Sequence, residues 1–261
     1  MKNLLTLILC CLASMNAWSN KSITIFDPLL GQKQVNYLEE NGYAITEGDI
    51  IISKLSSIKQ PSAVFRPKIS GGRWPRGVVA FQIDENLPFA NKLSVMQAIF
   101  HWQKNTHLTF IEVNNKNRED WPDYIKFVPA EGTTCSSFVG RQGGEQVINL
   151  SPRCTAMNTV HEIGHAVGFW HEQSRGDRNY YIKINWDNID EDHRYNFDQQ
   201  LNDGTDYEAY DYQSIMHYGP YAFSKNGEPT IVPLQDGVII GQRERLSDRD
   251  IIATNAMYPE V

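Results

Sequence analysis

The sequence predicts an α+β fold, because it contains both strand-like and helix-like segments. Four segments rich in β-branched and aromatic residues indicate strands: residues 78–83, 108–113, 124–128 and 147–150. Residues 92–104 carry apolar side chains at helical spacing, and residues 161–165 place two histidines on one face of another helix. A chain of 261 residues is long enough for one or two domains with a substantial core.

The composition is that of a soluble globular protein, with 41% hydrophobic and 21% charged residues. The formal net charge of −7 argues against nucleic acid or an anionic membrane surface as the partner, because both carry negative charge. We therefore expect no binding to nucleic acid.

The N-terminus has the pattern of a signal peptide. A basic residue precedes an apolar run over residues 4–13, which is too short to span a bilayer. Small residues at the −3 and −1 positions predict cleavage after Ser19. A lipoprotein interpretation of Cys10 and Cys11 is less favoured, because bulky residues precede them. We expect a secreted or extracytoplasmic protein without stable membrane insertion.

Residues 20–64 show no apolar core of their own. They contain a weak helical patch at residues 35–38 and a Gly48-Asp49 pair before the apolar residues 50–52. We expect this segment to be stable only when it packs on another surface.

The segment of residues 92–104 is predicted to be a helix that packs on the core. Its apolar residues recur at helical spacing: Leu93, Met96 and Phe100, with Val95, Ile99 and Trp102 beside them. Further along, residues 136–141 are short and strand-like. In the polar C-terminal part, residues 188–199 indicate a helix, and a capping box at Ser247 predicts a last helix that ends near Met257.

Cys135 and Cys154 are the two cysteines that remain after signal removal. An even number of cysteines in an exported chain favours a disulfide. The alternative is a pair of buried free thiols.

The strongest functional signal is a histidine-rich helix. His161 and His165 project from one helical face, so both imidazoles can bind one metal ion. Glu162 lies about 100° around the helix, next to the metal position, and its carboxylate stays free to act as a base on water. Gly168 favours the positive φ that commonly ends a helix, which allows the chain to return His171 as a third ligand.

Three histidine ligands and one open position are typical of a catalytic zinc site, whereas structural zinc is closed by four protein ligands. The alternative is a buried amphipathic helix whose histidines are satisfied by hydrogen bonds. Five specified residues at fixed spacing rarely coincide by chance, and this favours the metal site. We expect one Zn²⁺ per chain.

These residues carry a resemblance to a known family. Residues 161–172 resemble the long zinc signature of the metzincin metallopeptidases, and Glu172 directly after the third histidine is similar to the astacin branch. Residues 214–218 resemble the Met-turn of that family. Four further residues match astacin positions: Arg175, Asp177, Arg178 and Tyr181. Asn179 departs from the aspartate usual at its position.

The resemblance implies a metzincin-like catalytic domain of two subdomains. A twisted mixed sheet with long helices would lie above the zinc cleft, and an irregular C-terminal subdomain would lie below it. Met216 would form a hydrophobic floor under the metal, and Tyr218 would donate to the oxyanion, the alternative being a buried structural tyrosine. Glu172 would pair with the amine of the mature N-terminus.

The resemblance extends to the segment before the catalytic domain. Residues 47–50 resemble an astacin pro-segment, in which an aspartate takes the place of the zinc-bound water, so Asp49 is the expected zymogen switch. The aromatic residue usual in that motif is absent, since Thr46 stands there. The alternative is a plain turn before a strand.

Two further features follow from the resemblance. Cys135 and Cys154 match one of the family's two disulfide bridges. Ser136, Ser137 and Phe138 would form a short edge strand beside the cleft, and such an edge can accept an extended peptide as an additional strand. The alternative is an ordinary strand.

The sequence is therefore expected to encode a secreted, monomeric zinc endopeptidase that acts on peptide or protein substrates and is made as a zymogen. The expected organisation is a signal peptide at residues 1–19, a pro-segment at residues 20–64 and an astacin-like zinc peptidase domain at residues 65–261. Two alternatives stay open: a zinc-binding protein without proteolytic activity, and a zinc hydrolase that acts on a non-peptide substrate.

Overall fold

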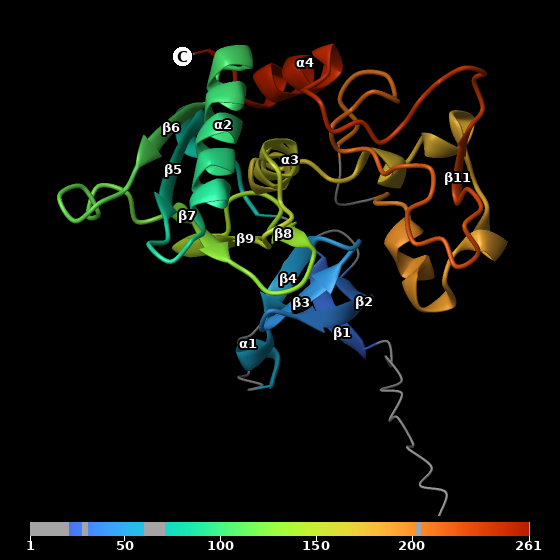
Figure 1. Cartoon of the computed structure of the whole chain (residues 1–261), viewed down its shortest axis with the longest axis horizontal. Coiled ribbons are helices and arrows are strands. Elements are labelled where there is room, and N and C mark those ends of the chain that lie inside the picture. Colours follow the sequence, from blue (N-terminus) through green and yellow to red (C-terminus); the bar gives the residue numbers. More distant parts are fainter. Residues whose placement is uncertain (1–20, 28–30, 60–70, 202–204, 261) are drawn as a thin grey trace, which may run out of the picture.

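A mixed β-sheet runs through the molecule and carries two long helices (Figure 1). The computed structural model describes residues 21–27, 31–59, 71–201 and 205–260. The predicted signal peptide lies outside the described residues. The sheet combines parallel and antiparallel strands and packs with helices, so the α+β prediction is confirmed.

Nine strands of the described residues form this sheet, in the order β1-β2-β3-β4-β8-β9-β7-β5-β6. Their bounds are Lys21–Asp27 (β1), Gly31–Glu40 (β2), Tyr43–Thr46 (β3), Ile50–Lys54 (β4), Val78–Ile83 (β5), Thr109–Glu112 (β6), Tyr124–Pro129 (β7), Cys135–Ser137 (β8) and Glu145–Leu150 (β9). β5 pairs in parallel with β6 and β7, and β7 pairs in parallel with β9, whereas β8 is antiparallel to β9. The four predicted strands are thus confirmed as β5, β6, β7 and β9.

Helices α2 (Phe89–Asn105) and α3 (Ala156–Ala166) pack with β5, β7 and β9 in one hydrophobic cluster (Figure 1). Trp102 lies between the two helices, where its Nε1 donates to the Val160 carbonyl at 3.0 Å. The predicted helix over residues 92–104 is confirmed, and it is longer than expected at its N-terminal end.

The core-facing side of α2 was predicted only in part. Three of the expected residues are buried: Val95, Ile99 and Trp102. The other three are 50–64% exposed: Leu93, Met96 and Phe100. Only one side of the helix meets α3 and the sheet, and the second set of apolar residues lies on the opposite side. Helical spacing alone does not show which of two apolar stripes faces the core.

The N-terminal strands β1 to β4 extend the sheet beside β8, followed by the short helix α1 (Leu55–Lys59). The predicted helical patch at residues 35–38 is wrong, because these residues belong to β2. Val35 and Tyr37 are buried and Asn36 between them is exposed, which is the two-residue period of a strand.

The expectation that residues 20–64 lack a core is also wrong for the described part of that segment. Six of its residues form a small buried cluster: Ile25, Val35, Tyr37, Ala44, Ile50 and Ile52. Val139, beyond β8, belongs to the same cluster. As expected, the segment therefore packs on the rest of the chain.

The region after α3 is irregular. It contains one two-stranded sheet, β10 (Ile182–Ile184) with β11 (Ile231–Pro233), and several short 3₁₀ helices. The predicted helix at residues 188–199 is wrong in type, because the structure has a 3₁₀ helix at Glu191–Phe197. The last helix is confirmed as α4 (Asp248–Met257), which begins with the predicted capping box at Ser247.

Candidate active site

Helix α3 carries two of the three predicted metal ligands. Its first turn is fixed by a capping box, in which Thr155 Oγ1 accepts from Asn158 N at 3.3 Å and Asn158 Oδ1 accepts from Thr155 N at 3.1 Å. Its apolar face packs into the core through Ile163. His161 and His165 are buried on the same helix, with ring centroids 4.8 Å apart.

The end of α3 brings the third histidine back to the first two. Gly168 has a φ of +118°, a conformation that is strained for residues with a side chain. After this turn His171 packs against His165, with ring centroids 4.6 Å apart. At Gly164 an added Cβ would lie 2.5 Å from Met216 Sδ, so the helix lies directly on the predicted hydrophobic floor.

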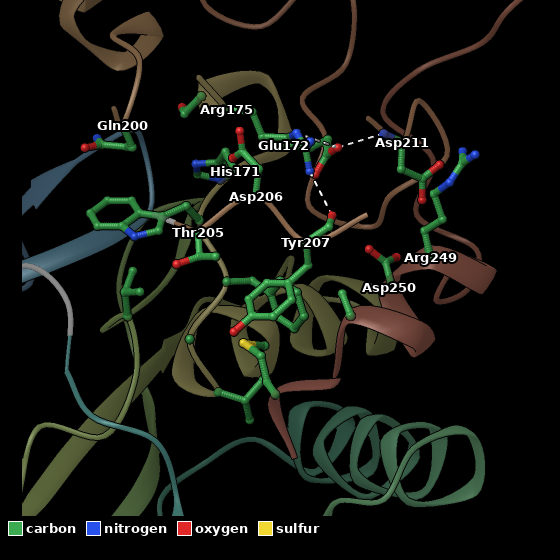
Figure 2. Close-up of a pocket in the computed structure, with 18 of the residues that line it drawn as sticks. His171, Glu172, Arg175, Gln200, Thr205, Asp206, Tyr207, Asp211, Arg249 and Asp250 are labelled. Atoms are coloured by element: carbon green, nitrogen blue, oxygen red, sulfur yellow. Dashed lines mark hydrogen bonds and ion pairs between the residues drawn. The ribbon is translucent and has the colours of Figure 1, made fainter. Parts of the chain in front are cut away.

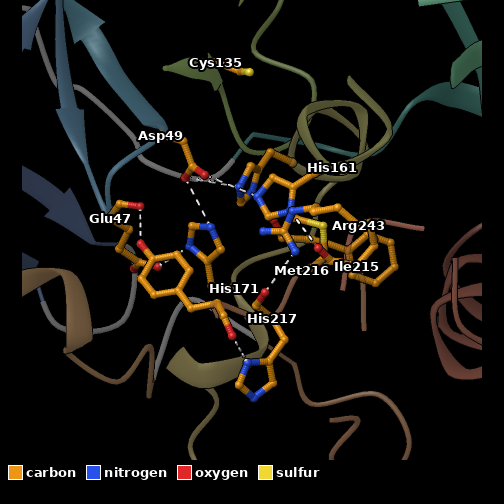
Figure 3. A network of polar contacts seen from close by, with 12 residues as sticks. Glu47, Asp49, Cys135, His161, His171, Ile215, Met216, His217 and Arg243 are labelled. Carbon is orange, nitrogen blue, oxygen red and sulfur yellow. Dashed lines mark hydrogen bonds and ion pairs between the residues drawn. The ribbon is translucent and has the colours of Figure 1, made fainter. Parts of the chain in front are cut away.

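The three histidines and Asp49 converge on one point (Figure 3). One ligand atom from each residue lies within 4.8 Å of those of the other three. Asp49 Oδ2 is 3.2 Å from His161 Nε2, and Asp49 Oδ1 is 3.4 Å from His165 Nε2 and 3.2 Å from His171 Nε2. Two ligands of a tetrahedral zinc ion at about 2.0–2.1 Å are separated by roughly 3.3–3.4 Å. The observed separations therefore match one shared cation.

The other ring nitrogens determine the tautomer of each histidine. His161 Nδ1 and His165 Nδ1 each lie 2.8 Å from a backbone carbonyl, those of Ile215 and Phe169. His171 Nδ1 lies 3.0 Å from the Glu47 carboxylate. Since carbonyl and carboxylate oxygens only accept, each Nδ1 carries the proton and each Nε2 presents a lone pair.

Lone pairs on three Nε2 atoms thus face a carboxylate, an arrangement that needs a cation at its centre. His165 Nε2, His171 Nε2 and Asp49 Oδ1 are buried without a hydrogen-bond partner. Burial opposes a positive charge at His171, but the Asp49 and Glu47 carboxylates outweigh it and raise the pKa of His171 to about 9. The carboxylates thus favour a positive charge at this point, which a bound cation would supply in place of a second ring proton. The donor set of nitrogens and one oxygen fits zinc, and the cluster can hold one metal ion.

Glu162 lies beside this cluster in a small cavity of about 220 Å³, which Asp49, His161 and Tyr218 also line. Its Oε2 is buried without a hydrogen-bond partner. Burial, and after it the charge of Asp49, holds the pKa of Glu162 well above its usual range. A buried carboxylate next to the metal position has the placement that a base acting on water requires.

Tyr218 is also at the site, although its hydroxyl does not point to the histidine cluster. The hydroxyl donates to the backbone carbonyl of Glu47, and the ring lies 4.5 Å from the His171 ring. Gln173 holds its backbone, accepting from Tyr218 N at 3.0 Å. The residue predicted to stabilise an oxyanion is therefore engaged by the N-terminal segment.

The strand predicted to be an edge is paired on both sides. β8 is antiparallel to β9, and β4 lies on its other side with Ile50 opposite Ser137. Ser137 N donates to the Asp49 carbonyl at 2.9 Å. The strand also ends at Ser137, so Phe138 lies beyond it. The edge prediction is wrong for this chain as it stands in the structure, because β4 already occupies that edge.

Glu172 lies in a different cavity, of about 220 Å³, which His171 also lines (Figure 2). Its Oε1 accepts from Asp211 N at 2.7 Å and is 3.6 Å from Arg175 Nε. Burial raises the pKa of Glu172 to about 8, although the charge of Arg175 opposes this shift. Gly71 and Gly72 line the same cavity.

The predicted disulfide is present. Cys135 at the start of β8 is bonded to Cys154, which lies just before α3. The bond joins the strand beside the cleft to the helix that carries His161 and His165.

Three residues that contact the histidine cluster or its neighbours were not predicted as site residues: Glu47, Gln200 and Arg243. Glu47 was noted only as part of a motif, although its side chain contacts His171. Gln200 donates to Glu47 from a position far along the chain. Arg243 is half-buried beside the cluster, where its NH1 donates to the His217 carbonyl at 3.0 Å. No local pattern distinguishes these residues from ordinary polar ones.

Comparison with known proteins identifies the family. The family model described as Astacin, a peptidase family, matches residues 68–259. The chain belongs to the astacin family. It is 40% identical over 189 residues to zinc metalloproteinase nas-13 of Caenorhabditis elegans, covering 71% of this chain and 41% of that protein. It is 33% identical over 240 residues to astacin-like metalloendopeptidase of Mus musculus, covering 88% of this chain and 52% of that protein.

A solved structure of the family shares the architecture. High choriolytic enzyme 1 of Oryzias latipes, a hatching enzyme zinc-protease, superposes with a TM-score of 0.64 at 33% identity, covering 73% of this chain and 94% of that chain. This astacin spans about half of the length, or less, of the two relatives described above. Among its described residues, no helix has both the length and the apolar character needed to cross a membrane.

Proposed function

We propose that this chain is a zinc endopeptidase of astacin type that hydrolyses peptide bonds in peptides or proteins. The observation that carries the proposal is the convergence of three Nε2 lone pairs on one point, with the buried Glu162 carboxylate beside it. His161, His165 and His171 would hold one zinc ion. When bound, zinc supplies Lewis acidity to the scissile carbonyl and to a water molecule.

The residues of the chain would supply the proton transfers. Glu162 takes a proton from the attacking water and delivers it to the leaving amine, a task suited to a buried carboxylate beside the metal position. Tyr218 donates a hydrogen bond to the developing oxyanion once its hydroxyl leaves the Glu47 carbonyl. Met216 supports α3 from below at Gly164.

The chain is proposed to be made as a zymogen, with a signal peptide at residues 1–19, a pro-segment at residues 20–64 and the peptidase domain at residues 65–261. Two contacts of the pro-segment support latency. Asp49 lies within hydrogen-bond distance of the three histidines, where its carboxylate would occupy the open metal position. Strand β4 pairs with β8, where an extended substrate would pair.

Removal of the pro-segment would restore β8 as an edge strand through Ser136, Ser137 and Phe138. Glu172 is the proposed partner of the new N-terminal amine, because its partly buried carboxyl lines a cavity that Gly71 and Gly72 also line. We further propose that the protein is exported and acts as a monomer.

The test uses the processed chain and a peptide library, with and without a chelator. Cleavage that stops with chelator and returns with added zinc supports the proposal. Glu162→Ala is the matched control, because it leaves the three histidines in place. It should retain one zinc per chain yet lose at least about 10²-fold in kcat. Full activity of the zinc-loaded variant would contradict the mechanism, and absence of peptide cleavage by the wild type would favour a different substrate class or no catalysis.

A further inference from the structure

We propose that Glu47 orients His171 for metal binding, so that the pro-segment retains the metal as well as covering it. This inference rests on the proposed zinc site and zymogen. It concerns the opposite side of the imidazole from Asp49, namely Nδ1 rather than Nε2.

The three histidines differ in where their orienting partners come from. The Nδ1 atoms of His161 and His165 donate to carbonyls of the peptidase domain, those of Ile215 and Phe169. Among the described residues, the hydrogen-bond acceptor of His171 Nδ1 is Glu47, which precedes that domain. Removal of the pro-segment therefore leaves two ligands oriented as before and takes the partner from the third.

Glu47 is held in place as a structural component of the site. The residue is 1% exposed. One oxygen, Oε2, lies 3.0 Å from His171 Nδ1 and 3.0 Å from Ser174 Oγ, while Oε1 accepts from Gln200 Nε2. All three partners belong to the proposed peptidase domain, so both oxygens of the carboxylate are held.

The backbone of Glu47 indicates that this placement overrides a local preference. Its φ is +45°, a left-handed conformation that residues with a side chain rarely adopt. Such a conformation persists only where surrounding contacts impose it. It allows the chain to direct Glu47 towards one nitrogen of His171 and, two residues later, Asp49 towards the other.

A carboxylate on the second nitrogen of a ligating histidine fixes its ring and increases its basicity. Loss of such a partner typically costs 10–100-fold in metal affinity. The uncleaved chain should therefore bind zinc more tightly than a chain that has Asp49 but lacks Glu47. Removal of the pro-segment would weaken the binding of zinc by His171.

The experiment uses the uncleaved chain in a Glu162→Gln background, which prevents self-cleavage. Zinc affinity is measured by competition with a chromogenic chelator, and the Co²⁺-substituted protein gives a visible absorption spectrum. Glu47→Ala should weaken zinc binding about 10–100-fold and shift the Co²⁺ bands. Glu47→Gln should lose less, because its amide oxygen still accepts from Nδ1.

The matched control is Glu40→Ala. Glu40 is also a pro-segment carboxylate that contacts the peptidase domain, accepting from Thr134 Oγ1, but it touches no histidine of the cluster. The Glu40→Ala variant should have a zinc affinity within about twofold of that of the parent chain. Equal losses in Glu40→Ala and Glu47→Ala would overturn the proposal, because they would reflect general loosening of the segment. Parental affinity in both Glu47 variants would overturn it as well.

A second series in the Asp49→Ala background separates Glu47 from Asp49. The loss caused by Glu47→Ala should persist there, since Glu47 acts on His171 directly. If the loss disappears, Glu47 acts only by seating Asp49, and the proposal is wrong. His171→Ala distinguishes the two levels of inference. Unchanged zinc affinity in that variant would refute both the proposed zinc site and the role of Glu47. A large loss of zinc affinity in His171→Ala, with no loss in the Glu47 variants, would refute only the role of Glu47.

Discussion

Each imidazole of the cluster uses its two nitrogens for different purposes. Nδ1 donates to an oxygen that fixes the ring, and Nε2 faces the point shared with Asp49. Glu162 and Tyr218 stand beside this point without a metal-facing contact of their own, Tyr218 being bonded to Glu47. The proposed role of Tyr218 therefore requires its hydroxyl to leave the Glu47 carbonyl, as the proposed removal of the pro-segment would allow.

Tyr218→Phe tests the role of the hydroxyl. In the processed chain it should lower kcat by about 10²-fold with little change in KM, because the phenol donates mainly to the transition state. Steady-state kinetics on one peptide gives both constants. A loss confined to KM would show instead that Tyr218 helps to bind the substrate.

At the scale of the element, α3 depends on how closely it approaches the loop beneath it. Gly164 allows the helix to lie on Met216, and the capping box at Thr155 fixes its first turn. The disulfide between Cys135 and Cys154 ties the start of this region to β8. The helix, the floor and the cleft strand are thus held in one arrangement.

Gly164→Ala tests this close approach. Alanine gains about 1 kcal/mol in helix propensity, but overpacking of a core typically costs about 1–3 kcal/mol, so we expect net destabilisation. The melting temperature should fall, at about 2–4 °C per kcal/mol for a chain of this size.

The matched control for this variant is Gly219→Ala. An added Cβ at Gly219 meets nothing within 4 Å. It should leave the melting temperature nearly unchanged. A stable Gly164→Ala protein would mean that Met216 moves aside at little cost.

At the scale of the whole molecule, the N-terminal strands and the catalytic part share one sheet. β4 contributes to the sheet through β8, while the turn before β4 contributes Glu47 and Asp49 to the site. The proposed latency would therefore have two parts, a carboxylate at the metal position and a strand at the substrate position.

Asp49→Ala tests whether the first part is sufficient. In the uncleaved chain it should free the metal position and release partial activity, or speed self-processing, while β4 still covers β8. Uncleaved wild type and uncleaved Asp49→Ala are compared on a short peptide, with chain length verified by mass. If neither chain cleaves the peptide, latency would be assigned to the strand alone. Full activity of the uncleaved wild type would refute the zymogen proposal.

The sequence by itself determined the features that depend on local spacing. The interval between His161 and His165 places both on one face of a helix, and Gly168 allows the turn that returns His171. Strands such as β5 and β7 were recognised from β-branched and aromatic residues, because side-chain shape acts locally. The family followed from the same short motif.

Only the tertiary structure decided which surfaces these elements meet. Leu93 and Val95 are both apolar residues of α2, and packing alone determined that Val95 is buried and Leu93 exposed. β8 has the sequence of a cleft strand, yet β4 covers its edge. Glu47 is an ordinary glutamate in the sequence. It becomes the partner of His171 because the turn that contains Glu47 packs against His171, which lies far along the chain. Such contacts join residues far apart in the chain, and local preference contains no information about them.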